Sequence, residues 1–295
     1  MKANEKVNGL LNFADLKLVR YKILYSFMFA IMLLLALVAI LPVIWVFLSG
    51  FKTPAEMYSL TPTLLPEKID FGMIAKAWEK VRFGQAYLNT AYIIIGCLAF
   101  DISCNGMLGF VLSRIRPTGS KIIDTLVFWS MLLPGISMVP LYITFTDIPI
   151  LHINMTGSFL PIWIMSGCNA FNVLMFRNFF NGIPMSYIEA ARLDGASDVG
   201  IFTKIIIPLS KPIIAVVTIF SVTGSWGSFM WPYLLLGSSQ YEPVAVKLYQ
   251  LTGNPSIQDN ELMIIMMLTI IPPAIMYAFF SKQIMGGLNM SGIKG

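Results

Sequence analysis

Long stretches without charged residues dominate the hydropathy pattern of this chain. Five of them hold no Asp, Glu, Lys or Arg, and a sixth holds one acid, Asp101, near its middle. A helix rises about 1.5 Å per residue, so about 20 apolar residues cross the roughly 30 Å hydrocarbon core of a bilayer. The pattern therefore predicts six membrane-spanning helices. They cover residues 23–51, 83–113, 125–146, 153–176, 212–241 and 262–281.

The composition agrees with this pattern. Hydrophobic residues make up 57% of the 295 residues and charged residues 12%, and the mean hydropathy is +0.75. Soluble globular domains carry about 25% charged residues. The net charge of +5 would suit a nucleic-acid partner if the basic residues formed a patch, but here they are sorted by membrane side. We expect an all-α polytopic membrane protein that does not bind nucleic acid.

The distribution of Lys and Arg predicts the orientation in the membrane. Six spans put both termini on one side, and with the termini inside, 14 of the 20 basic residues lie in cytoplasmic segments and 6 lie outside. The positive-inside rule favours this arrangement, and Arg114 and Arg116 are its strongest single support. The polar leader before Ile23 has no small-residue cleavage site, which argues against a removable signal peptide. We expect both termini in the cytoplasm.

Two external segments are long enough to have structure or contacts of their own. In residues 52–82, four apolar residues between Phe71 and Trp78 follow helical spacing, which suits either a short amphipathic helix on the outer interface or a mere connector. Residues 237–260 are polar, aromatic and rich in turn residues. A loop of this kind is expected to touch a partner outside the membrane.

Residues suited to enzymatic catalysis are missing from the sequence. No GxxxxGK[ST] phosphate-binding loop occurs, so any ATP hydrolysis belongs to a partner. The only histidine, His152, lies in a short external turn with no catalytic triad or metal-ligand cluster around it. Cys97, Cys104 and Cys168 lie in apolar runs without CxxC spacing, as expected of packing residues. We expect neither an enzyme nor a bound cofactor or metal.

The polar loop between the fourth and fifth spans carries the most specific signal. Ser186, with Glu189 three residues later, matches a capping box and predicts a short helix that begins there. Gly195 is expected to end this helix, and Ser197 is expected to open a second one. The loop is therefore predicted to fold as helix, turn and helix on the cytoplasmic side.

The surface of this loop is expected to fit a groove of another protein. Ala190 and Ala191 would give it a shallow exposed face. Glu189, Arg192 and Asp194 would supply charges at the rim of that face. This combination is typical of a contact site.

At this point the sequence resembles a known family. The spacing of Glu189, Gly195 and Pro208 is similar to the EAA loop of the membrane subunits of ATP-binding cassette importers, with Ile207 where that pattern usually has Leu. The resemblance implies that two cytoplasmic ATPases grip this loop. The residues implied to couple to them are Glu189, Ala190, Ala191, Asp194, Gly195 and Pro208.

Two further stretches resemble the importers of the maltose type, which carry carbohydrates. Residues 225–232 are similar to a Trp-Asn-x-Phe-x-Trp-Pro stretch of that group, with Gly227 in place of the usual Asn. Residues 286–295 are similar to its Gly-Leu…Gly-x-x-Lys-Gly ending. The resemblance covers most of residues 85–295.

The resemblance implies a fold, a location and partners. It implies a type I importer permease in a bacterial inner membrane, with residues 1–84 as leader, first span and external loop, a core of 85–282 that includes the coupling loop 184–208, and a cytoplasmic tail of 283–295. The implied partners are a second permease subunit, two cytoplasmic ATPases, an extracellular sugar-binding protein and membrane lipid. The implied function is the import of a sugar or oligosaccharide, with no cofactor of its own.

Candidates for the sugar pathway follow from the chemistry of sugars, whose C–H edges stack on aromatic rings while their hydroxyls bond amides. The candidates are Trp226, Phe229 and Trp231 on the fifth span and Asn169 and Asn172 on the fourth. For each of them, packing inside the protein or contact with the lipid interface is an equal alternative.

Asp101 is an acid near the middle of the second span. A charge that faces lipid there costs about 2.5–3.5 kcal/mol on insertion scales, so its side chain should face protein or water. Asn105 lies one turn on and Cys97 one turn back, and Gly106 and Gly109 permit a close helix contact. A structural hydrogen-bonding role is favoured over contact with substrate.

The sequence is compatible with two other functions. The first is an importer subunit for another solute, such as an amino acid or a phosphorylated polyol. The second is an ion-coupled secondary transporter that acts alone, which would need a buried charge relay and repeated halves. Residues 1–147 and 148–295 show no convincing match, and the spans hold no such relay.

Overall fold

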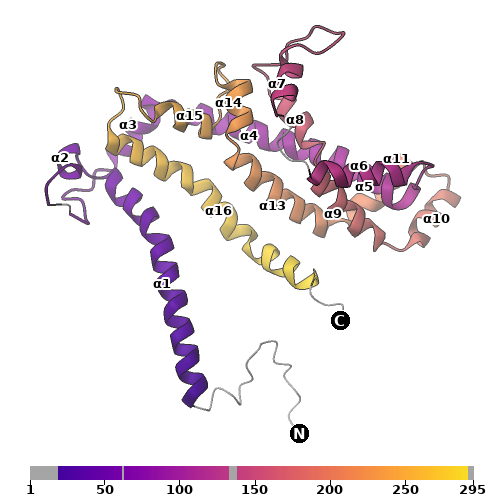
Figure 1. The fold of residues 1–295 in the computed structure, drawn as a ribbon, viewed down its shortest axis with the longest axis horizontal. Coiled ribbons are helices and arrows are strands. Elements are labelled where there is room, and N and C mark those ends of the chain that lie inside the picture. The colour runs from indigo at the N-terminus through magenta and orange to yellow at the C-terminus, as the bar shows by residue number, and fades with distance from the viewer. Residues whose placement is uncertain (1–18, 62, 133–137, 292–295) are drawn as a thin grey trace. The chain divides into compact units, whose positions relative to one another are not determined.

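Helices make up the described structure. The computed structural model describes residues 19–61, 63–132 and 138–291, the side chains of Arg20 and of residues 280–291 excepted, and none of these residues is in a strand. They form two compact units, Met1–Ile74 with Gln258–Met267 and Ala75–Ile257 with Leu268–Gly295 (Figure 1). The prediction of an all-α chain is confirmed for the described residues.

In the first unit, α1 (Val19–Gly50) is a single apolar helix. Its residues Tyr21–Gly50 are long and apolar enough to cross a membrane. Nearly all of its side chains are exposed, as expected of a helix that is apolar on every side and faces lipid or another subunit. At its end, a Cβ added to Gly50 would lie 3.0 Å from the side chain of Ile264 in α16 (Asp259–Ser291), so only glycine permits this approach without a shift.

A short polar segment follows α1 in the same unit. α2 (Pro54–Met57) begins with a capping box, in which the Thr53 hydroxyl accepts a hydrogen bond from the Glu56 amide and the Glu56 carboxylate accepts one from the Thr53 amide. The same carboxylate accepts a hydrogen bond from the Glu67 amide at 2.8 Å. These bonds from Thr53 and Glu67 hold the pKa of Glu56 below its ordinary value.

In the second unit, the second predicted span is one continuous helix, Phe83–Ile115. It consists of α4 (Phe83–Phe100), η2 (Asp101–Asn105), α5 (Gly106–Phe110) and η3 (Val111–Ile115), where the η segments are π-helical. Short π-helical turns within an α-helix are frequent at functional sites. Here η2 contains the acid predicted to lie near mid-span.

The fourth and fifth predicted spans are broken. The fourth contains α8 (Leu160–Ser166) and α9 (Ala170–Asn181), and the fifth contains α13 (Lys211–Gly227) and α14 (Met230–Leu236). The prediction of one continuous helix over each of these stretches is therefore wrong. The breaks are only three and two residues long, and the count of charge-free residues does not detect an interruption that short.

The third predicted span corresponds to α6 (Ser120–Leu132) and α7 (Met138–Thr146), and residues 133–137 lie outside the described part. By length and composition, three described helices can cross a membrane, or four if the bent pair Asp198–Leu209 and Lys211–Gly227 forms one span. The count of six spans and the side of the termini stay predictions.

Besides α2, two helices lie within the segments predicted to be external. α3 (Gly72–Lys80) is a helix, one of the two alternatives left open for residues 52–82, and its Trp78 ring lies 5.6 Å from the Phe83 ring. Its position at the membrane interface stays a prediction. α15 (Val244–Leu251) was not predicted, and its residue Val246 is fully buried. The segment 237–260 is therefore partly folded against the core rather than a free loop.

Gly109 allows α5 and α9 to approach closely. A Cβ added there would lie 2.8 Å from the Phe176 Cβ and 3.0 Å from the Arg177 amide nitrogen. A Cβ added at Gly106 would meet its nearest atom, in the Phe202 ring, at an ordinary 3.5 Å. The predicted close helix contact is confirmed at Gly109, and Gly106 has more room.

Within the second unit, Tyr87 of α4 binds a backbone carbonyl of α16 that a proline leaves unpaired. Proline has no amide hydrogen, so Pro272 leaves the carbonyl of Leu268 without its helical donor. The Tyr87 hydroxyl donates a hydrogen bond to this carbonyl at 2.6 Å. The bond therefore satisfies a backbone group that would otherwise be unpaired within an apolar span.

Candidate functional site

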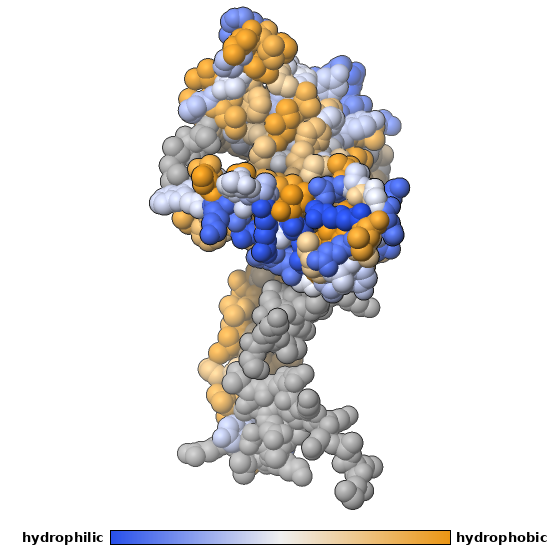
Figure 2. Space-filling model, turned by 90° about the vertical axis from the view of Figure 1, so that its right-hand side faces the viewer, coloured by the Kyte–Doolittle hydropathy of each residue, from blue (hydrophilic) through white to orange (hydrophobic). Residues whose placement is uncertain are grey.

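The loop between α9 and α13 folds as helix, turn and helix, as predicted. α10 (Met185–Leu193) is followed by α11 (Asp198–Ile201), η4 (Phe202–Ile206) and α12 (Ile207–Leu209). Figure 1 shows α10 and α11 at one end of the second unit. Figure 2 looks onto that end, where hydrophilic residues gather.

Gly195 forms the turn between the two helices. Its φ is +79°, in the left-handed region that favours glycine. Its amide donates to the Arg192 carbonyl at 3.0 Å, and the Ala196 amide donates to the Ala191 carbonyl at 2.9 Å. This pair of bonds is a Schellman motif, so the predicted helix end at Gly195 is confirmed.

The starts of the two helices differ in how they are capped. Pro184 is the N-cap of α10 and no side chain caps this helix, because the helix already begins before Ser186. The predicted capping box of Ser186 and Glu189 is therefore wrong. At α11 the Ser197 hydroxyl accepts a hydrogen bond from the Gly200 amide at 3.2 Å, so the second predicted helix start is confirmed.

α10 has an inner and an outer face. Ala191 is only 8% exposed, so the exposed position predicted for it is wrong. Successive helical residues are rotated by about 100°, so two neighbouring alanines do not share one face. The outer face instead carries Ala190 with Tyr187 and Leu193, which are 52% and 90% exposed. Sequence reasoning missed these two large side chains, although their spacing of three residues around Ala190 was a usable signal.

The other residues considered for contact on this loop fall into two groups. Glu189, Asp194 and Pro208 are exposed, as a contact role requires. Arg192 instead forms an ion pair within the loop, with 2.9 Å between its guanidinium and the Asp198 carboxylate. The carboxylates of Glu189 and Asp194 thus contribute negative charge beside an apolar outer face.

A hydrophobic cluster connects the inner face of the loop to the long helices. It joins residues of α10, α11 and η4 to residues of α5, α9 and α13. Its members are Phe110, Phe176, Phe180, Ile183, Ile188, Ala191, Ile201, Phe202, Ile206, Ile213 and Val217. Close-packed interiors transmit displacement rather than absorb it. A force on the loop would therefore move these helices.

Arg114 adds a polar connection to the same loop. Its Nε donates to the Phe180 carbonyl at 2.8 Å, and its terminal nitrogen donates to the carbonyls of Phe180 and Ile183. The last carbonyls of a helix lack helical donors. Arg114 thus caps the end of α9 directly before the loop begins, a role that the sequence did not reveal.

The loop meets α13 at a sharp bend. The helical stretches Asp198–Leu209 and Lys211–Gly227 meet at 83°, with the fully buried Ser210 between them. A rigid loop joined to α13 by such a bend can act as a lever on this helix.

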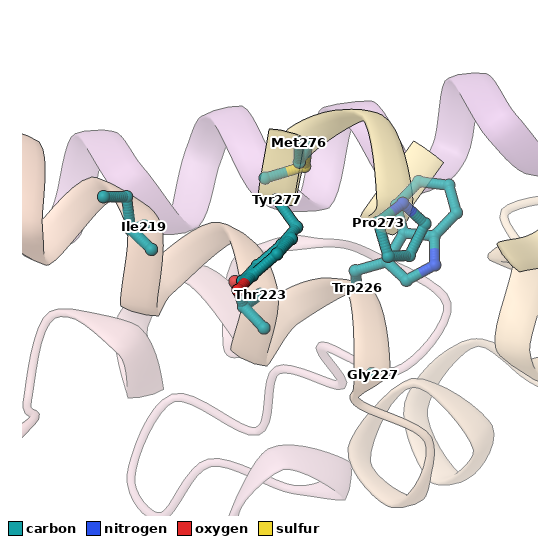
Figure 3. Close-up of a pocket in the computed structure, with 7 residues that line it drawn as sticks. All are labelled: Ile219, Thr223, Trp226, Gly227, Pro273, Met276 and Tyr277. Carbon is teal, nitrogen blue, oxygen red and sulfur yellow. The ribbon is translucent and has the colours of Figure 1, made fainter. Parts of the chain in front are cut away.

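A cavity of about 390 Å³ lies between α13 and the middle of α16 (Figure 3). Of the five predicted pathway residues, Trp226 is the one that lines it. Sequence reasoning missed the other lining residues, although a tyrosine and two prolines within an apolar span were a signal. The lining residues are Ile219, Thr223, Trp226, Gly227, Pro273, Met276 and Tyr277.

The other two aromatic candidates lie elsewhere. The Phe229 ring stacks on Tyr233 at 5.2 Å and contacts Tyr249 at 4.9 Å. The Trp231 ring contacts Phe145 at 6.4 Å and packs against a buried apolar cluster. The packing alternative therefore describes Trp231, while Phe229 belongs to a partly exposed aromatic group.

The two asparagine candidates belong to a buried network around Asp101. The Asp101 carboxylate is 1% exposed and accepts hydrogen bonds from the side-chain amides of Asn105 at 2.6 Å and Asn172 at 2.8 Å. The Asn169 side chain caps α9, and its backbone amide donates to the Asn105 side chain at 3.1 Å. These contacts fit the structural role predicted for Asp101, and they extend it to Asn169 and Asn172.

The remaining candidates are the histidine and the three cysteines. Among the described residues, no group of three or more His, Cys, Asp or Glu could hold a metal ion. His152 is exposed, with its Nδ1 3.2 Å from the Asp147 carboxylate. Cys97, Cys104 and Cys168 are free thiols.

Long apolar helices with a folded polar loop packed into their ends are typical of the membrane subunits of transporters. Residues 105–285 match the family described as binding-protein-dependent transport system inner membrane component. This match covers more than half of the chain, which belongs to that family. It is therefore a multi-pass membrane permease component, and a carrier that works alone on an ion gradient does not fit this family.

Individual relatives extend the likeness over most of the chain. The polygalacturonan/rhamnogalacturonan transport system permease protein YtcP of Bacillus subtilis (strain 168) is 27% identical, over 90% of this chain and 96% of its own. The diacetylchitobiose uptake system permease protein NgcG of Streptomyces coelicolor is 26% identical, over 88% and 86%. A crystal structure of a bacterial ABC transporter for import of the acidic polysaccharide alginate matches with a TM-score of 0.78 at 26% identity, over 90% of this chain and 98% of its own.

Proposed function

We propose that this chain is the membrane-spanning permease subunit of an ATP-driven importer for a sugar or oligosaccharide in a bacterial inner membrane. The relatives named above transport polygalacturonan, diacetylchitobiose and alginate, which supports a carbohydrate substrate. The family description includes dependence on a binding protein. The partners are thus an extracellular sugar-binding protein, a second permease subunit and two cytoplasmic ATPases, which hydrolyse the ATP.

The observation that carries this proposal is the two-faced 184–208 loop. Its outer face offers Tyr187, Ala190 and Leu193 beside acidic groups, which suits a groove on an ATPase. Its inner face is packed into the helices around Phe176 and Phe202. When the ATPases close, the loop transmits their movement to α9 and α13 and exchanges inward for outward access.

The outer segment 237–260 is the proposed contact for the binding protein. α15 holds its first part against the core through Val244 and Val246. The turn after it, with Gly253 at a φ of +90°, is exposed. Loops with these properties commonly bind partners.

Substitution of the outer face of the loop tests the proposal. Leu193→Glu should leave the fold intact because this side chain is 90% exposed, but it should reduce retention of the ATPases on an affinity-tagged permease and abolish uptake of sugar into vesicles. Ile150→Glu is the matched control, because Ile150 is 93% exposed in a different loop. Normal uptake by Leu193→Glu would refute the coupling role of the loop.

A further inference from the structure

Two glycines near the end of α13 open onto empty space. A Cβ added at Gly224 or at Gly227 meets no atom within 4 Å. Gly227 lines the cavity between α13 and α16, whereas Gly224 is not among the lining residues. Neither has a positive φ, so a side chain at either position fits the backbone without strain.

We propose that this cavity is a subsite for one sugar ring and that Gly227 sets the size of the ring it admits. This inference rests on the proposed sugar import and deepens it, because it gives this subunit a binding surface of its own. The ring would stack on Trp226, and its hydroxyls would bond Thr223 and Tyr277.

The dimensions and lining of the cavity suit such a ligand. Its volume of about 390 Å³ lies within the roughly 300–1,000 Å³ of small-molecule pockets. Trp226 supplies an aromatic surface held in place by the Tyr87 ring at 5.7 Å. Figure 3 shows Tyr277 reaching from α16 toward Thr223, so two hydroxyl groups lie within an otherwise apolar lining. A pyranose ring has apolar C–H faces and polar hydroxyls around its edge. A mostly apolar lining with a few polar groups therefore suits it.

The break in the helix provides further acceptors. α13 ends at Gly227, and its last carbonyls have no helical donors, although the Ser225 carbonyl accepts a hydrogen bond from the Ser228 amide. Irregular backbone in a membrane-spanning region is tolerated where it is buried in protein or lines a watery cavity. A sugar hydroxyl can donate to these carbonyls, which a hydrocarbon ligand cannot do.

Gly227 controls the remaining space because it brings no side chain into the cavity. Alanine would remove part of this space, and leucine would fill more of it. Leucine at Gly224 would add the same apolar bulk one helical turn away, at a position that does not line the cavity. The chain thus offers a matched pair of substitutions on one helix.

The test uses the complete importer, with its second permease subunit and ATPases, in proteoliposomes with its binding protein. A panel of oligogalacturonides, N-acetylchitooligosaccharides, arabino-oligosaccharides and maltodextrins is offered to the wild type, and the sugar that accumulates is used for the variants. Uptake should be highest in the wild type, lower in Gly227→Ala and lowest in Gly227→Leu. The leucine variant should take up sugar about tenfold more slowly than the wild type, as when a pocket excludes part of its ligand. The ATPases should co-purify with every variant as they do with the wild type, and uptake by Gly224→Leu should stay normal.

Tyr277→Phe provides a second measurement that needs no added bulk. Loss of one hydroxyl should raise the sugar concentration at half-maximal uptake, while the ATPases still co-purify with this variant. Wild-type uptake by Gly227→Leu, or equal losses in Gly224→Leu and Gly227→Leu, would overturn the subsite while sugar import stands. If the wild type accumulates neither a sugar of the panel nor any other sugar that its binding protein binds, the proposed function fails and the subsite fails with it.

Discussion

At the scale of single residues, the acid in the second span shows how an apolar chain accommodates a charge. Asp101 is surrounded by amides rather than by cations: Asn105 and Asn172 donate to its oxygens, and Ser221 adds a hydroxyl. These donors come from η2, α9 and α13. The carboxylate therefore joins three helices, which explains why a costly group can be kept in the span.

Asp101→Leu is expected to destabilise the protein. It removes the acceptor of the Asn105 and Asn172 amides, and a buried donor left unsatisfied costs about 1–3 kcal/mol. Asp101→Asn keeps one oxygen and should cost less. The melting temperature of the purified complex in detergent checks this order. An unchanged melting temperature together with lost uptake would instead indicate that Asp101 contacts the substrate.

Gly195→Val is expected to disturb the loop, whereas Gly195→Asn should be tolerated. A β-branched residue at a φ of +79° costs about 1–2 kcal/mol, and asparagine adopts this conformation more readily. Both variants should reach the membrane, because the apolar helices are unaltered. Co-purification of the ATPases measures the difference. If the valine variant retains them as the wild type does, the shape of this turn does not matter for coupling.

At the scale of elements, close contact between helices depends on where glycine stands. Gly109→Ala should destabilise the contact of α5 with α9, since its Cβ would lie 2.8 Å from the Phe176 Cβ and overpacking costs about 1–3 kcal/mol. Gly106→Ala is the matched control, with 3.5 Å to its nearest neighbour. Thermal unfolding monitored by tryptophan fluorescence should show a lower midpoint for Gly109→Ala only. Equal midpoints would mean that α5 and α9 move apart at little cost.

Most elements were predictable from the sequence, but their interruptions and inner faces were not. Charge-free length predicted α1 and the Phe83–Ile115 helix because each is continuous. It missed the break at residues 167–169, because hydropathy does not detect a gap of three residues, although the N-cap Asn169 was a signal. Gly195 and Ser197 were recognised from local turn chemistry, which depends on few neighbours. The cavity depends on packing between α13 and α16, and no local pattern contains it.

At the scale of the whole molecule, the second unit provides a continuous path from the loop to the cavity. The loop packs on Phe176 of α9 and Val217 of α13, and α13 continues to Trp226 at the cavity wall. Movement of the loop would therefore reach the proposed sugar subsite along one helix. Because the loop meets α13 at 83°, a sideways pull on the loop would tilt that helix.

The orientation of the chain decides whether this path can work, because the ATPases reach only loops on the cytoplasmic side. The bias of 14 to 6 basic residues predicts that the 184–208 loop is inside.

A reporter enzyme active only outside should give a signal when fused after Leu60 or Ser256 and none after Gly119, Ser197 or the C-terminus. A fusion at any of the four positions within the chain need not disrupt the core, because Leu60, Gly119, Ser197 and Ser256 are exposed. A reporter active only in the cytoplasm, fused at the same positions, should give the opposite pattern and controls for poor expression. An external signal after Ser197 would place the loop beyond the reach of any ATPase, and the coupling role proposed for Glu189, Gly195 and their neighbours would fail.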